Sequence, residues 1–280
     1  MDEMDVDKDL SFRGESANND LSFLNGNFRM KMSAGSFYIP RSDKAPLGED
    51  AHFICGEEET IGVADGVGSW ARKGIDPGEY SRQLVRNAEL SIQKQKDQRN
   101  KINPMEVLNE AYLNTKCQGS STACILTLCC DTIHAVNVGD SRFVVIRDGV
   151  IVYKSEIQQR GFNYPFQLGN GVELDDPSVA QEINAAVRIG DVIVMATDGL
   201  FDNVHNHELE KLVHDGVGDL HKLETFSKML AQKIAEYALQ KSESKTVYTP
   251  YAEECSKAQI YRPGGKRDDI TVIVAQILPR

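Results

Sequence analysis

The stretch that decides the fold is residues 121–154, STACILTLCCDTIHAVNVGDSRFVVIRDGVIVYK. Four short runs rich in β-branched residues lie within it, at 121–129, 133–138, 142–147 and 150–154. The links between them are Asp131-Thr132, Gly139-Asp140 and Asp148-Gly149. Asp and Gly are residue types that reverse a chain tightly. This spacing predicts four consecutive strands in an antiparallel meander.

Further strand patterns lie on both sides of this stretch. Residues 51–55 and 60–64 flank Gly56-Glu57-Glu58-Glu59 and read as the two arms of a hairpin. Later in the chain, strand patterns recur at 186–188, 192–197 and 270–278. Because most of these runs are apolar on both faces, we expect the sheets to be covered on both sides.

Three segments have the signals of amphipathic helices. Ser81 to Lys96 and Leu223 to Leu239 carry apolar residues at intervals of three and four. Asn103-Pro104-Met105-Glu106 is a helix start signal, with an Asn cap, a proline in the first turn and a glutamate three residues after the cap. We expect these helices to cover the sheets. Residues 155–171 and 241–266 sustain no period and are predicted to be long loops.

The 280-residue chain is acidic, with 42 Asp and Glu against 31 Lys and Arg and a net charge of −11. Such a surface argues against a nucleic-acid partner, because that affinity relies on clustered Lys and Arg. Seven acids and two bases fall within the first 20 residues. We therefore predict an acidic, mobile leader over residues 1–30 and a single folded domain over 31–280. No apolar run reaches the roughly eighteen residues that a membrane span needs.

Several common catalytic motifs are absent from the sequence. None of the six cysteines starts a C-x5-R phosphate-binding loop, and no G-x-S-x-G nucleophile elbow occurs. Gly265-Lys266 matches the end of a phosphate-binding P-loop, but Ile260 stands where the first glycine of that motif should be. We therefore exclude these three catalytic solutions.

Aspartates stand at the ends of three apolar runs. Asp65-Gly66 and Asp198-Gly199 each follow such a run, and Asp268-Asp269 precedes one. A single Asp-Gly is often an ordinary turn, as we expect for Asp148-Gly149. Three such acids, with Glu49-Asp50 ahead of another strand, instead favour a cluster of carboxylates at the rim of a sheet. All-oxygen ligands favour hard cations such as Mg²⁺ or Mn²⁺.

Six motifs occur in the order and character of the protein phosphatase 2C (PPM) family of metal-dependent serine/threonine phosphatases, which the chain resembles over about residues 33–278. The motifs are GEDA at 48–51, VADGVG at 63–68, GSSTA at 119–123, NVGDSR at 137–142, ATDGLFD at 196–202 and RDDIT at 267–271. The Asp-Gly-Val-Gly form at 65–68 is similar to the branch that includes organellar and plant members.

The resemblance implies an α+β fold, a four-layer α-β-β-α sandwich of two antiparallel sheets flanked by helices. It also implies a centre that holds two Mg²⁺ or Mn²⁺ ions per subunit, with a third, weaker site in some members. The matched ligands are Asp65, Gly66, Asp198 and Asp268 for the two ions, Glu49 and Asp50 through bound waters, and Asp140 and Asp202, with Asp198, for the third. In this scheme Asp65 bridges the two ions, and the carbonyl of Gly66 completes the shell of the second.

The implied activity is hydrolysis of phosphoserine and phosphothreonine on proteins by a metal-activated water, without a phosphoenzyme intermediate. Asp65, Asp198 and Asp268 would carry the catalysis, and Arg41 is the candidate for binding the phosphate. One alternative is a pseudophosphatase that serves as a binding module through residues 155–171 and 241–266. The other is a metal-dependent phosphatase of small molecules. We expect phosphoprotein substrates and a monomeric, intracellular protein, cytoplasmic or nuclear, or organellar if a longer precursor carries a targeting segment.

Two positions differ from the usual residues of the family, and Arg41 lies eight residues before Glu49, a longer gap than in the best-known members. Val67 stands where most members have a histidine, so the proton donor to the leaving group must come from elsewhere, such as a metal-bound water. His52 is the nearest histidine in sequence, and we expect it to be structural or solvated. Asp269 replaces a frequent asparagine after the last ligand, and the Arg-Asp pairing at 267–268 favours Asp268 as that ligand.

Overall fold

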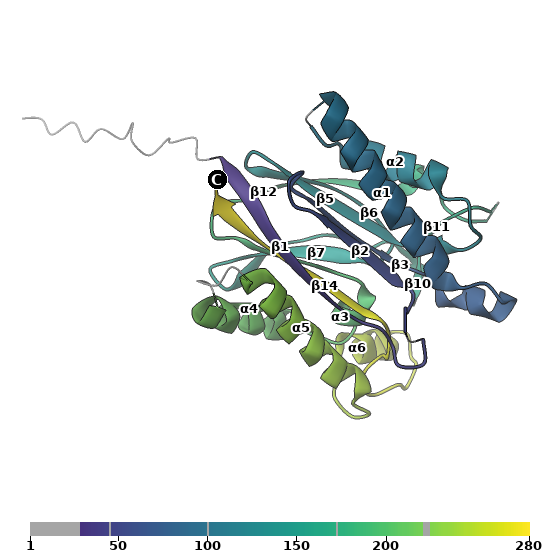
Figure 1. Ribbon diagram of the computed structural model, residues 1–280. Helices are drawn as coiled ribbons and strands as arrows, with labels where there is room; N and C mark the ends of the chain where they lie inside the picture. Colours follow the sequence, from purple (N-terminus) through teal and green to yellow (C-terminus); the bar gives the residue numbers. More distant parts are fainter. Residues whose placement is uncertain (1–28, 45, 100, 172, 221–224) are drawn as a thin grey trace, which may run out of the picture.

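The computed structural model describes residues 29–280 except 45, 100, 172 and 221–224. Two five-stranded antiparallel sheets pack face to face, and helices cover the outer face of each (Figure 1). This arrangement confirms the α+β class and the four-layer sandwich. The predicted leader over residues 1–30 lies outside the described residues except for its last two, so the leader stays a prediction.

The first sheet holds both ends of the described chain. Its order is β1 (Met30–Ile39), β14 (Ile270–Pro279), β13 (Val192–Ala196), β7 (Arg142–Arg147) and β8 (Val150–Lys154). β1 and β14 pair in register along their full lengths, from Met30 opposite Pro279 to Ile39 opposite Ile270. The last two strand runs of the sequence, 192–197 and 270–278, thus lie side by side in one sheet.

The second sheet contains the predicted hairpin. Its order is β12 (Gln181–Ala186), β6 (Thr132–Val138), β5 (Ala123–Cys129), β3 (Thr60–Asp65) and β2 (Asp50–Cys55). Two small two-stranded ladders join β4 (Ser120–Ser121) to β11 (Leu168–Gly169) and β9 (Gln159–Gly161) to β10 (Tyr164–Pro165). Residues 155–171, predicted to be a loop, therefore contain short strands.

The predicted four-strand meander is wrong at its middle turn. β5 pairs with β6 in one sheet and β7 pairs with β8 in the other, so Gly139-Asp140 carries the chain between the sheets. Gly139 has a φ of 97°, and a Cβ there would lie 2.6 Å from Thr122 Cγ2. Glycine allows this backbone conformation, and the chain leaves the second sheet for the first instead of forming a hairpin with β6. β12 and β13 are likewise divided between the two sheets.

Helices cover both outer faces (Figure 1). On the second sheet lie α1 (Pro77–Arg99) and α2 (Pro104–Asn114), and on the first lie α4 (Asn206–Leu220) and α5 (Phe226–Glu243). The remaining helices are α3 (Asp198–Phe201), α6 (Pro250–Lys257) and the 3-10 turns η2 (Gly68–Lys73) and η3 (Pro177–Val179). None of the helices in the described part of the chain offers an apolar stretch long enough to cross a membrane.

Glycines explain two elements that the sequence patterns did not predict. A Cβ on Gly35, in β1, would lie 2.4 Å from the backbone N of Lys228 in α5. A Cβ on Gly216, in α4, would lie 2.7 Å from Leu230 Cδ1 of α5. Glycine weakens the strand and helix patterns on which sequence analysis relies. At these two positions, however, it lets α5 approach β1 and α4 closely. α6, also unpredicted, does carry a visible signal, since Thr249 caps it and Pro250 is its first residue.

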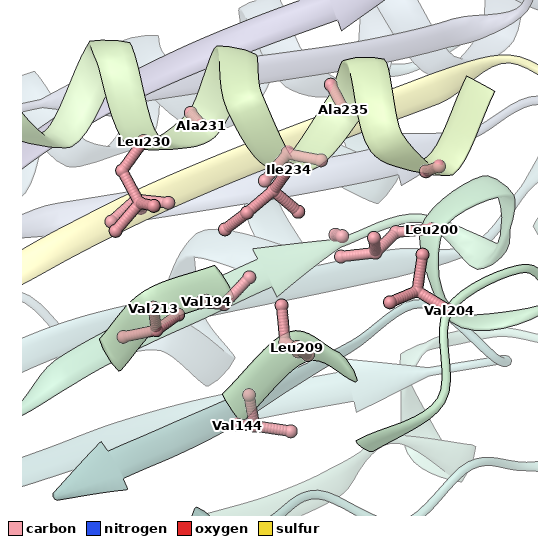
Figure 2. Close-up of a cluster of buried hydrophobic side chains, with 14 of the residues drawn as sticks. Val144, Val194, Leu200, Val204, Leu209, Val213, Leu230, Ala231, Ile234 and Ala235 are labelled. Carbon is pink, nitrogen blue, oxygen red and sulfur yellow. The ribbon is translucent and has the colours of Figure 1, made fainter. Parts of the chain in front are cut away.

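Three apolar clusters fill the spaces between the layers. One lies between the sheets and includes Ile61, Phe143 and Met195. A second lies under α1 and α2. In the third, shown in Figure 2, Leu230 and Ile234 of α5 point toward the first sheet. The inner strands of both sheets are thus buried on both faces, as their uninterrupted apolar runs predicted, whereas the edge strands β8 and β12 expose alternate residues.

The cap of α2 provides a modest test of the local structure. Asn103 Oδ1 accepts hydrogen bonds from the backbone N of Met105 at 3.0 Å and of Glu106 at 3.4 Å. We expect Asn103→Ala to lower the free energy of unfolding by about 1 kcal/mol, because two helix-end donors lose their acceptor. Asn103→Ser, which keeps a capping oxygen, should be close to wild type. Equal urea midpoints for the two variants would contradict this role.

Candidate metal centre

Asp50 links the two sheets at their shared rim. It begins β2 directly opposite Asp65, which ends β3. Its Oδ2 accepts hydrogen bonds from Thr197 Oγ1 at 2.8 Å and Thr271 Oγ1 at 2.7 Å, both in the other sheet's rim. Its Oδ1 is buried without a hydrogen-bond partner. Burial, then the charge of Asp269, raises the pKa of Asp50 to about 8, despite the two threonine hydroxyls.

Asp65 and Asp198 approach from the two sheets. Asp198 is the first residue of α3, immediately after β13 and Thr197. Its Oδ2 accepts from the Lys266 ammonium, and its Oδ1 is buried without a partner. Burial raises the pKa of Asp65 well above its usual range, and the nearby charge of Asp198 adds to that rise. The structure therefore brings together acids that lie 133 residues apart in the sequence.

The two aspartates before β14 have different surroundings. Asp269 is only 2% exposed, and its two oxygens accept from the backbone N of Arg41 at 2.7 Å and of Glu49 at 2.8 Å. Asp268 instead lies between two ammonium groups, 3.1 Å from Lys44 Nζ and 3.5 Å from Lys266 Nζ. Burial acts to raise the pKa of Asp268, but the two lysines outweigh it and the pKa is lowered. Asp269 thus holds the backbone, and Asp268 faces the acid cluster.

Gly66 and Glu49 are held against each other. The backbone N of Gly66 donates to the carbonyl of Glu49 at 3.1 Å, and a Cβ on Gly66 would lie 2.4 Å from the carbonyl oxygen of Pro77. The Glu49 side chain forms an ion pair with Lys44. Burial raises the pKa of Glu49, and Lys44 partly offsets that effect. Only glycine fits where the Asp65-Gly66 turn passes α1.

Asp140 and Asp202 lie near Asp198, close enough for their charges to act on it. Asp140 Oδ2 accepts from Gln159 Nε2 at 2.8 Å, and Asp202 Oδ2 accepts from Lys266 Nζ at 2.8 Å. Burial raises the pKa of Asp140, and the charge of Asp202 adds to that rise. All eight residues that the motifs assign to metal therefore gather around the same rim, while their roles as ligands stay predictions.

Two lysines of this cluster were not expected from the sequence patterns. Lys44 lies among Glu49, Asp268 and Asp269, and Lys266 lies among Asp198, Asp202 and Asp268. The sequence around a single lysine in a loop does not reveal whether its side chain is buried among acids or exposed to solvent. The glycine pair before Lys266 was the one available signal.

Arg41, the candidate for binding phosphate, is already paired. Its guanidinium contacts the Asp43 carboxylate twice, through Nε at 2.6 Å and Nη2 at 2.8 Å. It lies on the wall of a cavity of about 530 Å³ that Lys44 and Glu49 also line. Arg41 is therefore beside the acid cluster, with the Nε and Nη2 edge of its guanidinium already engaged by Asp43.

His52 is built into the sheet. Its Nε2 lies 2.9 Å from Ser36 Oγ, and burial lowers its pKa. This geometry agrees with a structural histidine. Val67, which directly precedes η2, has an apolar side chain and cannot donate a proton to the leaving group.

The donors at the rim fit hard divalent ions. In the described ranges, no three His, Cys, Asp or Glu side chains converge tightly enough to form a complete metal-binding group by themselves. The acids alternate instead with Lys44 and Lys266. Asp50 Oδ1 and Asp198 Oδ1 are nonetheless buried carboxylate oxygens without a partner, an arrangement that costs several kcal/mol unless a cation or proton meets it. Oxygen-only donors of this kind suit Mg²⁺ or Mn²⁺.

Comparison with known proteins decides the family. The chain is 38% identical over 259 residues to the rice "Putative protein phosphatase 2C 24", covering 89% of this chain and 78% of that protein. It is 36% identical over 251 residues to the human "Protein phosphatase PTC7 homolog", covering 82% and 80%. The chain belongs to the protein phosphatase 2C family. No protein-family model matches it.

Other members of the protein phosphatase 2C family are longer. The chain is 46% identical over 249 residues to "Probable protein phosphatase 2C 55" of Arabidopsis thaliana, which covers 89% of this chain but 52% of that relative. A second Arabidopsis protein, "Probable protein phosphatase 2C 80", is covered over 59% of its length. The chain thus spans somewhat more than half of these two relatives.

Solved structures share the protein phosphatase 2C fold of this chain. The photosystem II phosphatase PBCP superimposes with a TM-score of 0.79 at 29% identity, over 88% of this chain and 98% of that one. The catalytic domain of the phosphatase PstP, solved with two manganese ions, has a TM-score of 0.59 at 16% identity, over 89% and 99%. The second likeness bears on the fold alone.

Proposed function

We propose that this chain hydrolyses phosphoserine and phosphothreonine in proteins at a centre of two Mg²⁺ or Mn²⁺ ions, without a phosphoenzyme intermediate. The observation that carries the proposal is the meeting of Asp50, Asp65, Asp198 and Asp268 at one rim, with free carboxylate oxygens on Asp50 and Asp198. Names of relatives that are 36–46% identical agree with a protein phosphatase. No acid of the motif set is missing, which argues against a pseudophosphatase.

The chain's own residues would do most of the positioning. Asp65, Asp198 and Asp268, with the Gly66 carbonyl, would hold the ions, and Glu49 and Asp50 would bind the waters around them. When bound, such a pair of ions acidifies water and offsets the negative charge of the phosphoryl group. Thr197 and Thr271 orient Asp50, and Asp269 fixes the backbone of Glu49.

Two cavities beside the acids suit a phosphorylated peptide. The one at Arg41 also includes Arg72, so two guanidinium groups and Lys44 lie within reach of an incoming phosphate. A second cavity, of about 660 Å³, extends from Asp202 past Arg142 to Tyr251 in α6. Its mixed polar and aromatic lining fits a peptide chain better than a small sugar phosphate.

Metal dependence is the direct test of the activity. We expect hydrolysis of a phosphothreonine peptide with Mn²⁺ or Mg²⁺, loss of that activity in EDTA, and recovery when Mn²⁺ is restored in excess. Released inorganic phosphate is the measurement. Hydrolysis that persists in EDTA would refute the metal centre. Faster turnover of sugar or nucleotide phosphates than of phosphoproteins would favour a small-molecule phosphatase, and metal binding without any turnover would favour a pseudophosphatase.

A further inference from the structure

Lys266 places a fixed positive charge on one side of the acid cluster. Its side chain is 13% exposed, and its Nζ contacts Asp198 Oδ2, Asp202 Oδ2 at 2.8 Å and Asp268 Oδ2 at 3.5 Å. The two closest oxygens belong to Asp198 and Asp202. The charges of Asp202 and Asp140 both act on Asp198, and we call these three acids the Asp202 side of the cluster. The ammonium therefore already serves as the shared cation of these carboxylates.

The backbone of Lys266 is held in place on two sides. The fully buried Asn203 bonds it twice, accepting from its N at 2.9 Å and donating to its carbonyl at 2.9 Å. Asn203 also donates to the carbonyl of Gly199, beside Asp198. Gly264 has a φ of 94°, and a Cβ on Gly265 would lie 2.3 Å from the Lys241 carbonyl oxygen. The two glycines thus let this segment pack closely against α5 and direct the lysine inward.

Arg142 adds a second cation on the same side. It is largely buried, its guanidinium lies 4.7 Å from the centre of the Phe201 ring, and its Nε has no partner among the described residues. Burial lowers its pKa, while the charges of Asp202, Asp140 and Asp198 oppose that effect. On this side of the cluster, three carboxylates therefore face two cations supplied by the chain.

The other side of the cluster is not balanced in this way. The acids there are Glu49, Asp50, Asp65, Asp268 and Asp269. Lys44 contacts three of them, and Lys266 reaches only Asp268, at 3.5 Å, so five carboxylates share one lysine and the edge of a second. Buried carboxylates that crowd together need cations to remain ionised. Two divalent ions would balance this side, whereas the side of Asp140 and Asp202 has no comparable need.

We propose that the Lys266 ammonium takes the place of a divalent ion between Asp198 and Asp202, so that this chain binds two ions and not three. The inference rests on the two-ion centre of the proposed function. A divalent ion there would need Asp198 Oδ2 and Asp202 Oδ2, which the ammonium engages, and two cations cannot share these oxygens without strong repulsion. Asp198 Oδ1 has no partner and stays open to the two-ion centre. Removal of the lysine charge should therefore open a further metal site at Asp140, Asp198 and Asp202.

The number of bound Mn²⁺ ions tests this inference without an activity assay. Folded protein is equilibrated by dialysis over a series of Mn²⁺ concentrations, and bound metal is counted by elemental analysis. We expect two ions in the wild type, three in Lys266→Met, and two in Lys257→Met. Lys257 is a matched control, because it pairs with Glu253 and Glu254 on the exposed face of α6. Asp202→Asn, added to Lys266→Met, should return the count to two.

The outcomes separate the two proposals. Three ions in the wild type, or two in a folded Lys266→Met, would overturn the role of Lys266 while leaving the metal centre intact. No Mn²⁺ in the folded wild type would overturn the metal centre and with it this inference. If methionine at this position prevents folding, judged by circular dichroism, Lys266→Gln removes the charge with less loss of polarity, and the same third ion is expected.

Discussion

Replacement of Asp65 by asparagine is expected to lower the rate of phosphopeptide hydrolysis by roughly a thousandfold or more. If Asp65 holds the proposed ions, loss of its charge would remove several kcal/mol of transition-state stabilisation, and each 1.36 kcal/mol corresponds to a factor of ten. The volume of the side chain hardly changes. The fold should survive, because Asp65 is surrounded by the like charges of Asp50, Asp198 and Asp268, and removal of one charge relieves that repulsion.

Stability measurements separate lost chemistry from lost structure in this variant. We expect the melting temperature of Asp65→Asn in EDTA to be no lower than that of the wild type, and its gain on addition of Mn²⁺ to be smaller. Asp148→Asn is a matched control, since Asp148-Gly149 is also an Asp-Gly turn after a strand. Asp148 is 87% exposed and pairs with Arg188, far from the cluster's contacts. Near-normal activity in Asp65→Asn, or equal loss in both variants, would refute the assignment.

The strand-end acids could be predicted because their signal is local. Asp65, Asp198 and Asp268 each adjoin an apolar run in the sequence, and a run of that kind predicts a strand whatever its partner is. The local sequence around each strand did not indicate which other strands would pair with it. The convergence of these acids followed from the resemblance to the family, and the structure places Asp50 opposite Asp65 through the pairing of β2 with β3.

The positions that escaped prediction depend on contacts across the fold. At Gly139 the chain passes from one sheet to the other, so close to Thr122 that a side chain would not fit. The residues Gly139-Asp140 by themselves would serve a hairpin turn equally well. Lys266 reaches the acids because Asn203, just after α3, holds its backbone and two glycines let its segment pack against the end of α5. Such residues are recognised only once neighbours distant in sequence are known.

Gly199 joins the fold to the site, and its replacement by alanine is expected to have the largest effect on stability of any small substitution considered for this chain. A Cβ on Gly199 would lie 1.9 Å from the carbonyl oxygen of Asp269 and 3.2 Å from Ile270 Cα. Both neighbours are backbone, so α3 and the start of β14 must separate. We expect the free energy of unfolding, measured in urea with EDTA present, to fall by about 3 kcal/mol.

The same displacement should also weaken metal binding, because Gly199 stands between two of the proposed ligands. Asp198 precedes it, and the Asp269 backbone that it would push follows Asp268. Gly56→Ala is the matched control, since no atom lies within 4 Å of a Cβ built there. It should change neither the urea midpoint nor the affinity for Mn²⁺ measured by calorimetry. Wild-type stability in Gly199→Ala would show that α3 and β14 are not held as closely as this packing requires. Lost stability with unchanged Mn²⁺ affinity would show that the contact between Gly199 and Asp269 supports the fold but not metal binding.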